Sequence, residues 1–188
     1  LILEEDLAFF QFGILNNHGS ALPEYRGSNT LKWSIMEGEE WLGITWHGIS
    51  ADVDAGPIWM ESRIPIDPNI TAWELRADMI AEGIRLFPQA WQHFRFHDIA
   101  PRLPDLTGGR LWPPIKPEDG IIRPGLTRRK VKDIIRASCA PWPRAFILKG
   151  EMQIFVDGIS ECAGANTLTY TTVDDGVIHL HKMEDGEP

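Results

Sequence analysis

The stretch Phe12-Gly13-Ile14-Leu15-Asn16-Asn17-His18 decides which fold we expect for this chain. Its first four residues form an apolar run of the kind that fills a buried parallel strand, and its last three residues are polar. Pro23 and Gly27 follow in a loop, and residues 31–38 have the pattern of a short helix that ends at a glycine. A strand that passes through a polar turn into a helix is typical of α/β domains, whose ligands bind at the carboxyl ends of the strands.

Two further strands and a long helix are expected before residue 98. Residues 43–49 and 57–66 are rich in β-branched and aromatic side chains, with a loop at residues 50–54 between them. Thr71 and Glu74 have the spacing of a capping box, which predicts a helix start. The apolar residues that follow recur at intervals of three and four, as on one buried helical stripe: Leu75, Met79, Ile80, Ile84, Phe87, Trp91 and Phe94.

The composition changes after residue 100, where six prolines and several glycines occur between residues 101 and 124. We expect a linker at residues 106–124, after a first domain at residues 1–105 and before a small second domain at residues 125–188. In the second domain, Thr127 is expected to cap a helix over residues 128–138. Four short β-rich segments follow, which favours a partial, OB-like barrel.

The composition of the 188 residues is that of a globular protein with a net charge of -9. Two cysteines supply no disulfide framework and no four-cysteine metal site, so a reducing compartment, the cytoplasm, is the default location. No apolar run is long enough to span a membrane. The chain begins at Leu1 without a methionine, and we expect the N-terminal portion of the first domain to be missing.

The charge is unevenly distributed along the chain. Residues 1–105 hold 7 basic and 16 acidic residues, whereas residues 110–149 hold ten basic and three acidic residues, including the run from Arg128 to Lys132. A basic patch of this kind can bind phosphates. The more common explanation is a helix face whose charges pair with acidic groups elsewhere in the fold, and we favour that explanation.

Asn16 and His18 are the first candidates for chemistry. Successive residues of a strand face opposite sides, so both are expected on one side, with Asn17 on the other. An amide N–H can stabilise an oxyanion and an imidazole can move a proton, so the pair suits acyl transfer. The carboxylate that the imidazole needs would come from Asp52 or Asp54. On residue types alone, a polar cap of the loop is the more common reason for such a pair.

The longer pattern around these residues changes that assessment. The stretch Asn16-Asn17-His18-Gly19-Ser20-Ala21-Leu22-Pro23-Glu24-Tyr25-Arg26-Gly27 resembles the N-x-H-x-S-x-L-P-x-x-R-G signature of the folate-dependent formyltransferases. The segments Trp33 to Gly38, Gly43-Ile44-Thr45 with His47, and Asp54-Ala55-Gly56-Pro57-Ile58 continue that family's order of motifs. The resemblance covers residues 7 to about 98 and implies the C-terminal part of a doubly wound, Rossmann-like domain.

The resemblance implies that Asn16, His18 and Asp54 are catalytic, and their Asn-to-Asp interval of 38 residues agrees with the family's spacing. Asp54 is preferred to Asp52 because it directly precedes Ala55-Gly56. An amine would attack the formyl carbon of 10-formyltetrahydrofolate without a metal, while Asn16 and protonated His18 stabilise the oxyanion. The loop residues Ser50, Ala51, Asp52 and Val53 would contact the pteridine ring through their backbone.

Three more residues are candidates for binding the acceptor: Ser20, Tyr25 and Arg26. Arg26 could hold an anionic substrate or could pin its own loop, and both explanations stay open. His47, His179 and His181 have too few partners for a metal site, so a surface or core role is favoured for each.

The acceptor is expected to be the amine of a small molecule. The loop from Gly19 to Gly27 looks most like that of the sugar-nucleotide N-formyltransferases, whereas residues 134–145 resemble the C-terminal domain found in methionyl-tRNA formyltransferase. Transfer RNA is therefore the second candidate partner, and the acidic first domain argues against it. A hydrolase that releases formate is a further candidate function, as is a non-catalytic folate- or nucleotide-binding module. No membrane partner is expected, and a homo-oligomer is left open.

Overall fold

The computed structural model describes residues 4–174 and 176–183, so the features noted at Leu1 to Leu3 lie outside the described residues. The chain forms two compact units. The first is drawn mainly from residues up to Pro114, and the second from residues after it together with the segments Ile35–Glu39 and Pro68–Glu74. Within the described ranges, no helix has both the length and the apolar character that crossing a bilayer requires.

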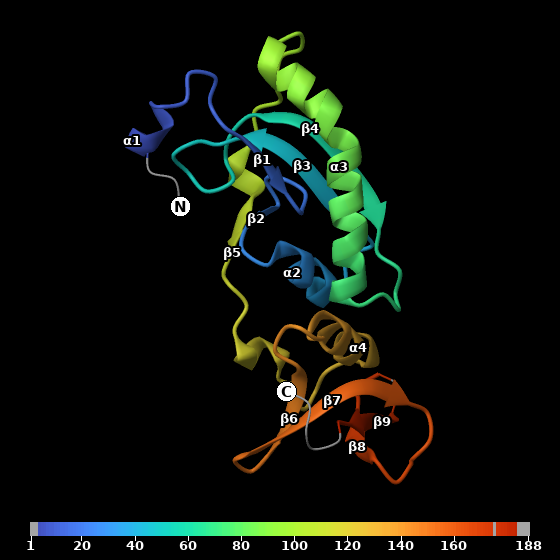
Figure 1. Ribbon diagram of the computed structural model, residues 1–188. Helices are drawn as coiled ribbons and strands as arrows, with labels where there is room; N and C mark the ends of the chain where they lie inside the picture. Colours follow the sequence, from blue (N-terminus) through green and yellow to red (C-terminus); the bar gives the residue numbers. More distant parts are fainter. Residues whose placement is uncertain (1–3, 175, 184–188) are drawn as a thin grey trace. The chain divides into compact units, whose positions relative to one another are not determined.

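The first unit contains a three-stranded sheet in the order β1-β3-β4 (Figure 1). Its strands are β1 (Leu15–His18), β3 (Trp41–Gly48) and β4 (Ile58–Pro65), and both pairings are antiparallel. A separate parallel pair joins β2 (Tyr25–Gly27) to β5 (Arg110–Trp112). The start of helix α2 (Thr30–Glu37) and most of helix α3 (Ala72–Phe96) complete an α/β unit.

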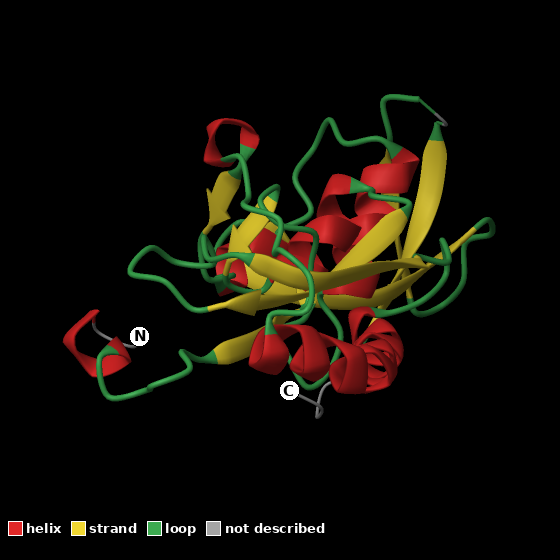
Figure 2. Ribbon diagram, turned by 90° about the horizontal axis from the view of Figure 1, so that it is seen from above, coloured by secondary structure: helices red, strands yellow, loops and turns green. Residues whose placement is uncertain are grey.

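The expectation of a buried parallel strand over residues 12–15 was wrong. Phe12 is 49% exposed and lies after the short helix α1 (Glu4–Leu7) and before the first strand. Figure 2 shows the loop that joins this helix to the strand. The strand begins at Leu15 and pairs antiparallel with β3, with Asn16 opposite His47 and His18 opposite Thr45. The polar residues themselves form the strand, because the ladder satisfies their backbone groups whatever their side chains are.

The helix α3 lies along one face of the sheet (Figure 1). It starts at the expected capping box, in which the Thr71 N–H donates to Glu74 (2.9 Å) and the Glu74 N–H donates to the Thr71 hydroxyl (3.3 Å). The Trp46 indole N–H donates to the Gly83 carbonyl at 3.0 Å. Hydrogen bonds from Arg85 and from the Ser62 hydroxyl of β4 lower the pKa of Glu82 to about 2. These contacts join the helix to β3 and β4.

The expected buried stripe of α3 is partly wrong. Leu75 and Phe94 are buried as expected, but Ile80, Ile84, Phe87 and Trp91 are all between 39% and 68% exposed. The row that faces the sheet runs through Leu86 and Ala90 and includes Gly83, whose Cα lies close to Asn17. Small residues carry little hydrophobic signal, so the periodic pattern shifted toward the larger side chains on the neighbouring row.

Leu86→Ala is expected to destabilise the first unit far more than Ile84→Ala. Leu86 is 3% exposed, and removing a buried leucine side chain typically costs about 2–5 kcal/mol of unfolding free energy. Ile84 is 68% exposed on the same helix, and its truncation should cost less than about 0.5 kcal/mol. Urea unfolding of the two variants measures the difference. Equal losses would show that the helix packs through the other row.

The second unit is a four-stranded antiparallel sheet in the order β6-β7-β9-β8. Its strands are β6 (Ala145–Lys149), β7 (Met152–Ser160), β8 (Thr167–Thr171) and β9 (Val177–Lys182). The helix α4 (Arg128–Ala137) is capped by Thr127 as expected, and its Val131, Ile134 and Ile135 are buried in the core of this unit. Two short 3-10 helices, Leu106–Gly108 and Pro117–Gly120, flank β5 in the proline-rich stretch. An OB-fold is a five-stranded barrel, so with four strands described the OB-like topology stays a prediction.

The basic residues of α4 are engaged within the second unit. Arg128 pairs with Glu161, and its backbone N–H donates to Asp174. The Lys130 ammonium lies 3.4 Å from Glu37, and that of Lys132 donates to Asn69 at 2.6 Å. The basic stretch is therefore a helix face whose charged groups have partners within the fold, which is the explanation that the sequence favours.

Candidate active site

Asn16 and His18 lie on the same side of β1, and Asn17 lies on the other, as the strand alternation predicts. Asn16 Nδ2 is 3.1 Å from His47 Nε2 of β3, and His18 Nδ1 is 3.7 Å from an Asp54 oxygen. Asn17 faces α3 instead, where a Cβ on Gly83 would come within 2.9 Å of its side-chain oxygen. The β1 ladder thus holds the amide and the imidazole two residues apart on one surface.

Asp54 connects this surface to the loop after β3. Its φ of +47° is in the left-handed region, which aspartate tolerates better than most residues. One carboxylate oxygen accepts the Gly27 N–H at 2.8 Å and faces His18, and the other lies 3.7 Å from His47 Nε2. Gly27 itself must be glycine, because its φ is +100° and a Cβ would come within 2.3 Å of the Trp112 carbonyl. The carboxylate therefore lies between two imidazoles.

The loop that carries Asp54 is held closed at its base. The Gly48 N–H donates to the Pro57 carbonyl at 2.8 Å, and a Cβ on Gly56 would come within 1.8 Å of the Gly48 carbonyl. The Arg26 Nε–H also donates to the Val53 carbonyl at 2.8 Å. The chain crosses itself this closely only with glycine at position 56, which explains why Asp54 directly precedes an Ala-Gly pair.

The proton arrangement of His18 follows from its neighbours. Its Nε2 lies 2.7 Å from the Tyr25 carbonyl, which can only accept, so this nitrogen carries a proton. The other nitrogen, Nδ1, faces the Asp54 carboxylate. A second proton on Nδ1 therefore places the positive charge of the imidazolium next to a negative group.

A cavity of about 390 Å³ opens beside Asn16, His47 and Asp54. Its described lining consists of Asn16, Gly27, Ser28, His47, Ile49, Ser50, Ala51, Asp52, Val53 and Asp54. The four loop residues expected to contact a pteridine ring, Ser50 to Val53, all line it. His18 lies behind this lining and reaches the cavity through Asp54.

The three residues expected to bind an acceptor do not line this cavity. Ser20 is fully buried, and its hydroxyl donates to the Tyr25 carbonyl at 2.6 Å. The ring of Tyr25 stacks on Trp112 with centroids 5.0 Å apart. The Arg26 Nε–H bonds the Val53 carbonyl, a contact that pins a loop, and binding of an acceptor by Arg26 stays a prediction. All three side chains support the backbone that carries the site.

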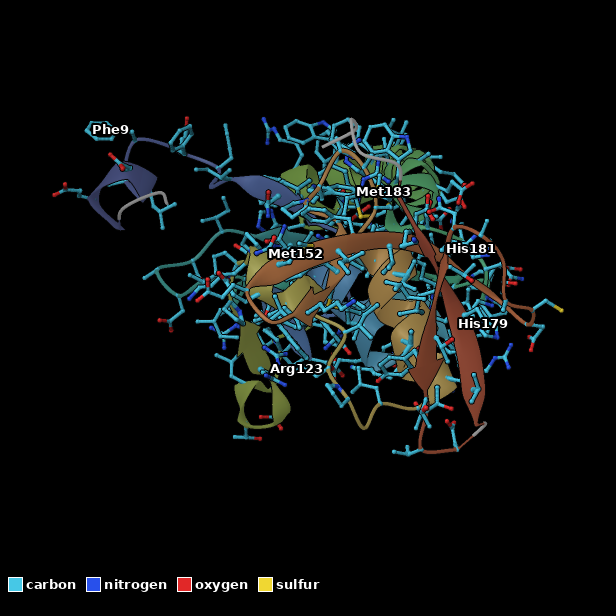
Figure 3. All side chains as sticks on the ribbon, turned by 90° about the horizontal axis from the view of Figure 1, so that it is seen from below. Phe9, Arg123, Met152, His179, His181 and Met183 are labelled. Carbon is cyan, nitrogen blue, oxygen red and sulfur yellow. The ribbon has the colours of Figure 1, made fainter. Side chains whose placement is uncertain are left out.

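His47 is the site residue to which the sequence assigned no role in the site. Sequence reasoning favoured a core or surface role for it, yet its side chain contacts Asn16 and lies 3.7 Å from Asp54. Burial lowers its pKa below the ordinary value of 6.5, against the opposing effects of the Gly48 carbonyl and Asp54. The antiparallel register that places His47 opposite Asn16 would have revealed it. His179 and His181 lie two residues apart on β9 (Figure 3).

Acidification is expected to destabilise the protein through His47. The pKa of His47 in the fold lies below 6.5, so the unfolded chain binds a proton at this residue more readily than the folded protein does. The free energy of unfolding therefore decreases as the pH falls. The contribution to stability is full above pH 6.5 and is lost as the pH falls toward the lowered pKa.

Urea unfolding at about pH 7.5 and about pH 5.5 measures this loss. His47→Gln should lose less stability between the two pH values than the wild type. His181→Gln, which changes an exposed imidazole of β9, should behave as the wild type (Figure 3). An unchanged loss in His47→Gln would mean that the imidazole does not stay neutral in the fold.

Comparisons with known proteins relate the chain to formyltransferases. Residues 1–91 match the protein family described as formyl transferase. A methionyl-tRNA formyltransferase of Sorangium cellulosum (strain So ce56) is 34% identical over 134 residues, which cover 71% of this chain and 43% of that protein. Across residues 4–174 and 176–183, no group of three or more histidine, cysteine or acidic side chains is placed to hold a metal ion.

Two solved structures share the fold. HypX from Aquifex aeolicus matches with a TM-score of 0.71 at 21% identity, over 97% of this chain and 35% of that chain. An N-formyltransferase from Helicobacter canadensis, in complex with folinic acid and dTDP-3-aminofucose, matches with a TM-score of 0.71 at 20% identity, over 90% of this chain and 66% of that chain. The chain thus spans less than half the length of the first relative in each comparison.

Proposed function

Because residues 1–91 belong to the formyl transferase family, we propose that this protein transfers the formyl group of 10-formyltetrahydrofolate to a primary amine. The observation that carries the proposal is that Asn16 and Asp54 line one cavity, with His18 Nδ1 3.7 Å from the Asp54 carboxylate behind that lining. An amide donor, an imidazole and a carboxylate come from three separate sequence positions, and Asp54 lies within 3.7 Å of both histidines. An oxyanion donor and an acid–base pair are the groups that formyl transfer to an amine uses.

Each residue has a distinct role in the proposed reaction. The amine nitrogen forms a bond to the formyl carbon, and the bond from that carbon to N10 breaks with its electron pair left on N10. Asn16 donates an N–H to the formyl oxygen as negative charge develops there. Asp54 and His18 take the proton that the amine loses and pass it to N10. The products are a formamide and tetrahydrofolate, so atoms and charges balance.

The cavity suits the head of a folate. Its volume of about 390 Å³ lies within the range of small-molecule sites. Much of its lining is the loop from Ile49 to Asp54, whose backbone donors and acceptors can pair with the polar edge of a pteridine ring. The Val53 carbonyl is already bonded to Arg26 and the Asp52 carbonyl to the Ser50 hydroxyl. We therefore assign the recognition to Ser50 and Ala51 and to the N–H groups of Asp52 and Val53.

We propose the amine of an amino-sugar nucleotide as the acceptor. The Helicobacter canadensis enzyme, which shares the fold, was solved with a sugar nucleotide. The basic residues of α4 support a small acceptor, because their bonds within the second unit leave less charge to bind a nucleic-acid backbone. The proposal includes a cytoplasmic location and an OB-like second domain.

Methionyl-tRNA is the second candidate acceptor. It is favoured by the 34% identity to a methionyl-tRNA formyltransferase over 134 residues, together with the resemblance of residues 134–145.

Acceptor competition tests the proposal. The full-length protein is incubated with 10-formyltetrahydrofolate and, in separate reactions, with amino-sugar nucleotides, with methionyl-tRNA and with no amine. We expect a formamide on an amino-sugar nucleotide. Formylation of methionyl-tRNA alone would replace the proposed acceptor. Formate release without an amine would indicate a hydrolase, and folate binding without turnover would indicate a binding module.

A further inference from the structure

His47 is a buried imidazole in which both ring nitrogens have partners. It is 2% exposed in the middle of the site. Its Nδ1 lies 2.9 Å from the Gly48 carbonyl, and its Nε2 lies 3.1 Å from Asn16 Nδ2. The roles proposed above for Asn16, His18 and Asp54 do not use it. A polar group this deeply buried costs folding free energy unless its bonds are satisfied, so its arrangement is well defined.

The partners of His47 determine where its proton lies. A carbonyl oxygen can only accept, so Nδ1 carries the proton that points to Gly48. Burial lowers the pKa of His47 and keeps the ring neutral near pH 7, which leaves Nε2 with a bare lone pair. Nε2 therefore accepts, and the Asn16 carboxamide must present its N–H to His47. The 3.7 Å separation of Nε2 from the Asp54 carboxylate agrees with this, because two acceptors do not approach closely.

This arrangement fixes which end of the Asn16 carboxamide serves the cavity. The amide nitrogen has two hydrogens, and the bond to His47 uses one of them. The other can be donated to a substrate oxygen, since Asn16 lines the cavity. Without an acceptor at Nε2, the carboxamide is free to turn over and present its oxygen, which would repel a developing oxyanion.

We propose that His47 is a positioning residue, which holds the Asn16 carboxamide with an N–H available to the formyl oxygen. The inference rests on the proposed function and deepens it. His47 acts through Asn16 alone and does not touch the reacting atoms. If His47 exchanged protons with the substrate directly, the decrease in kcat on removing His47 would add, in free energy, to the decrease on removing Asn16. If it only filled the core, its loss would change stability and leave the rate per folded molecule unchanged.

A double-mutant cycle in the full-length protein separates these cases. His47→Leu removes the acceptor and should lower kcat by about 10²-fold, the scale of losing one oxyanion donor, with the KM for 10-formyltetrahydrofolate within about threefold of wild type. Asn16→Ala should lower kcat similarly. The double variant should be within about twofold of Asn16→Ala alone, because His47 has nothing left to position. His47→Gln, which can offer an amide oxygen in place of Nε2, should recover at least about tenfold over His47→Leu.

Additive losses in the double variant, or an unchanged kcat in folded His47→Leu, would overturn the proposal. If His47→Leu does not fold, His47→Ala, which also lacks the acceptor, is compared with and without Asn16→Ala, and additive losses there overturn the proposal equally.

Nitrogen NMR of the free protein tests the arrangement without any substrate. We expect a protonated Nδ1 and a bare Nε2 at His47, with the Nε2 resonance shifted in Asn16→Ala. A protonated Nε2 would overturn the orientation even if formyl transfer is observed. Conversely, the expected resonances in a protein that transfers no formyl group would uphold the orientation and overturn the proposed function.

Discussion

Asp54→Asn is expected to lower kcat for formyl transfer by about 10³–10⁴-fold, on the scale of replacing the carboxylate partner of a catalytic imidazole in other enzymes. Asp54 is the one carboxylate within 4 Å of both His18 and His47 among the described residues. The neutral amide cannot balance an imidazolium charge or share the amine proton. The fold should survive, because the asparagine oxygen can still accept the Gly27 N–H that now bonds Asp54.

Steady-state kinetics with 10-formyltetrahydrofolate and the identified acceptor measure this effect. Asp78→Asn is the matched control, since it removes an exposed carboxylate from α3 of the same unit and should leave kcat within about twofold. A folded Asp54→Asn protein with wild-type turnover would remove Asp54 from the proposed catalytic group.

His18→Ala is expected to lower kcat by about 10²–10⁴-fold, the usual range for a general acid–base group. The loss should fall on kcat more than on the KM for the folate, because His18 lies behind the residues that line the cavity. The Tyr25 carbonyl keeps the Ser20 hydroxyl as a donor after the imidazole is removed, so no buried acceptor is left unpaired.

Added imidazole provides a control for this variant. It should restore part of the activity of His18→Ala by entering the space left by the side chain. His181→Ala, on β9, should keep wild-type activity with or without imidazole. Retention of wild-type kcat in folded His18→Ala would show that the proton is moved by another group.

Much of the fold follows from local sequence patterns. The strands β3 and β4, the capping box at Thr71 and the helix α4 with its Thr127 cap lie where β-branched runs and capping residues predict them. Local sequence patterns did not predict the direction in which β1 pairs. A short apolar run does not reveal whether its partner runs parallel or antiparallel, and β1 begins where the apolar run ends.

The row of α3 that packs on the sheet was also beyond local patterns. The contact row includes Gly83 and Ala90, whose small size lets the helix backbone approach the sheet closely. A pattern of large hydrophobic residues does not reveal such a close approach.

The sequence motifs predicted the candidate site residues that lie within them. Asn16, His18 and Asp54 are brought together as the formyltransferase resemblance implies. The roles of Arg26 and His47 depend on tertiary contacts, which spacing along the chain does not encode. Arg26 meets the Val53 carbonyl 27 residues away, and His47 meets Asn16 only through the register of an antiparallel pair. Knowledge of strand pairing would have identified the contact of His47, whereas that of Arg26 depends on the path of the loop that carries Val53.

The fate of a labelled formyl carbon tests the central claim most directly. The full-length protein is given 10-formyltetrahydrofolate with ¹³C in the formyl group, together with an amino-sugar nucleotide, and the label is followed by NMR. The account predicts a ¹³C formamide on the sugar amine in one-to-one ratio with tetrahydrofolate, and loss of that signal in Asp54→Asn. Label that appears only as free formate, or that stays on the folate, would contradict it.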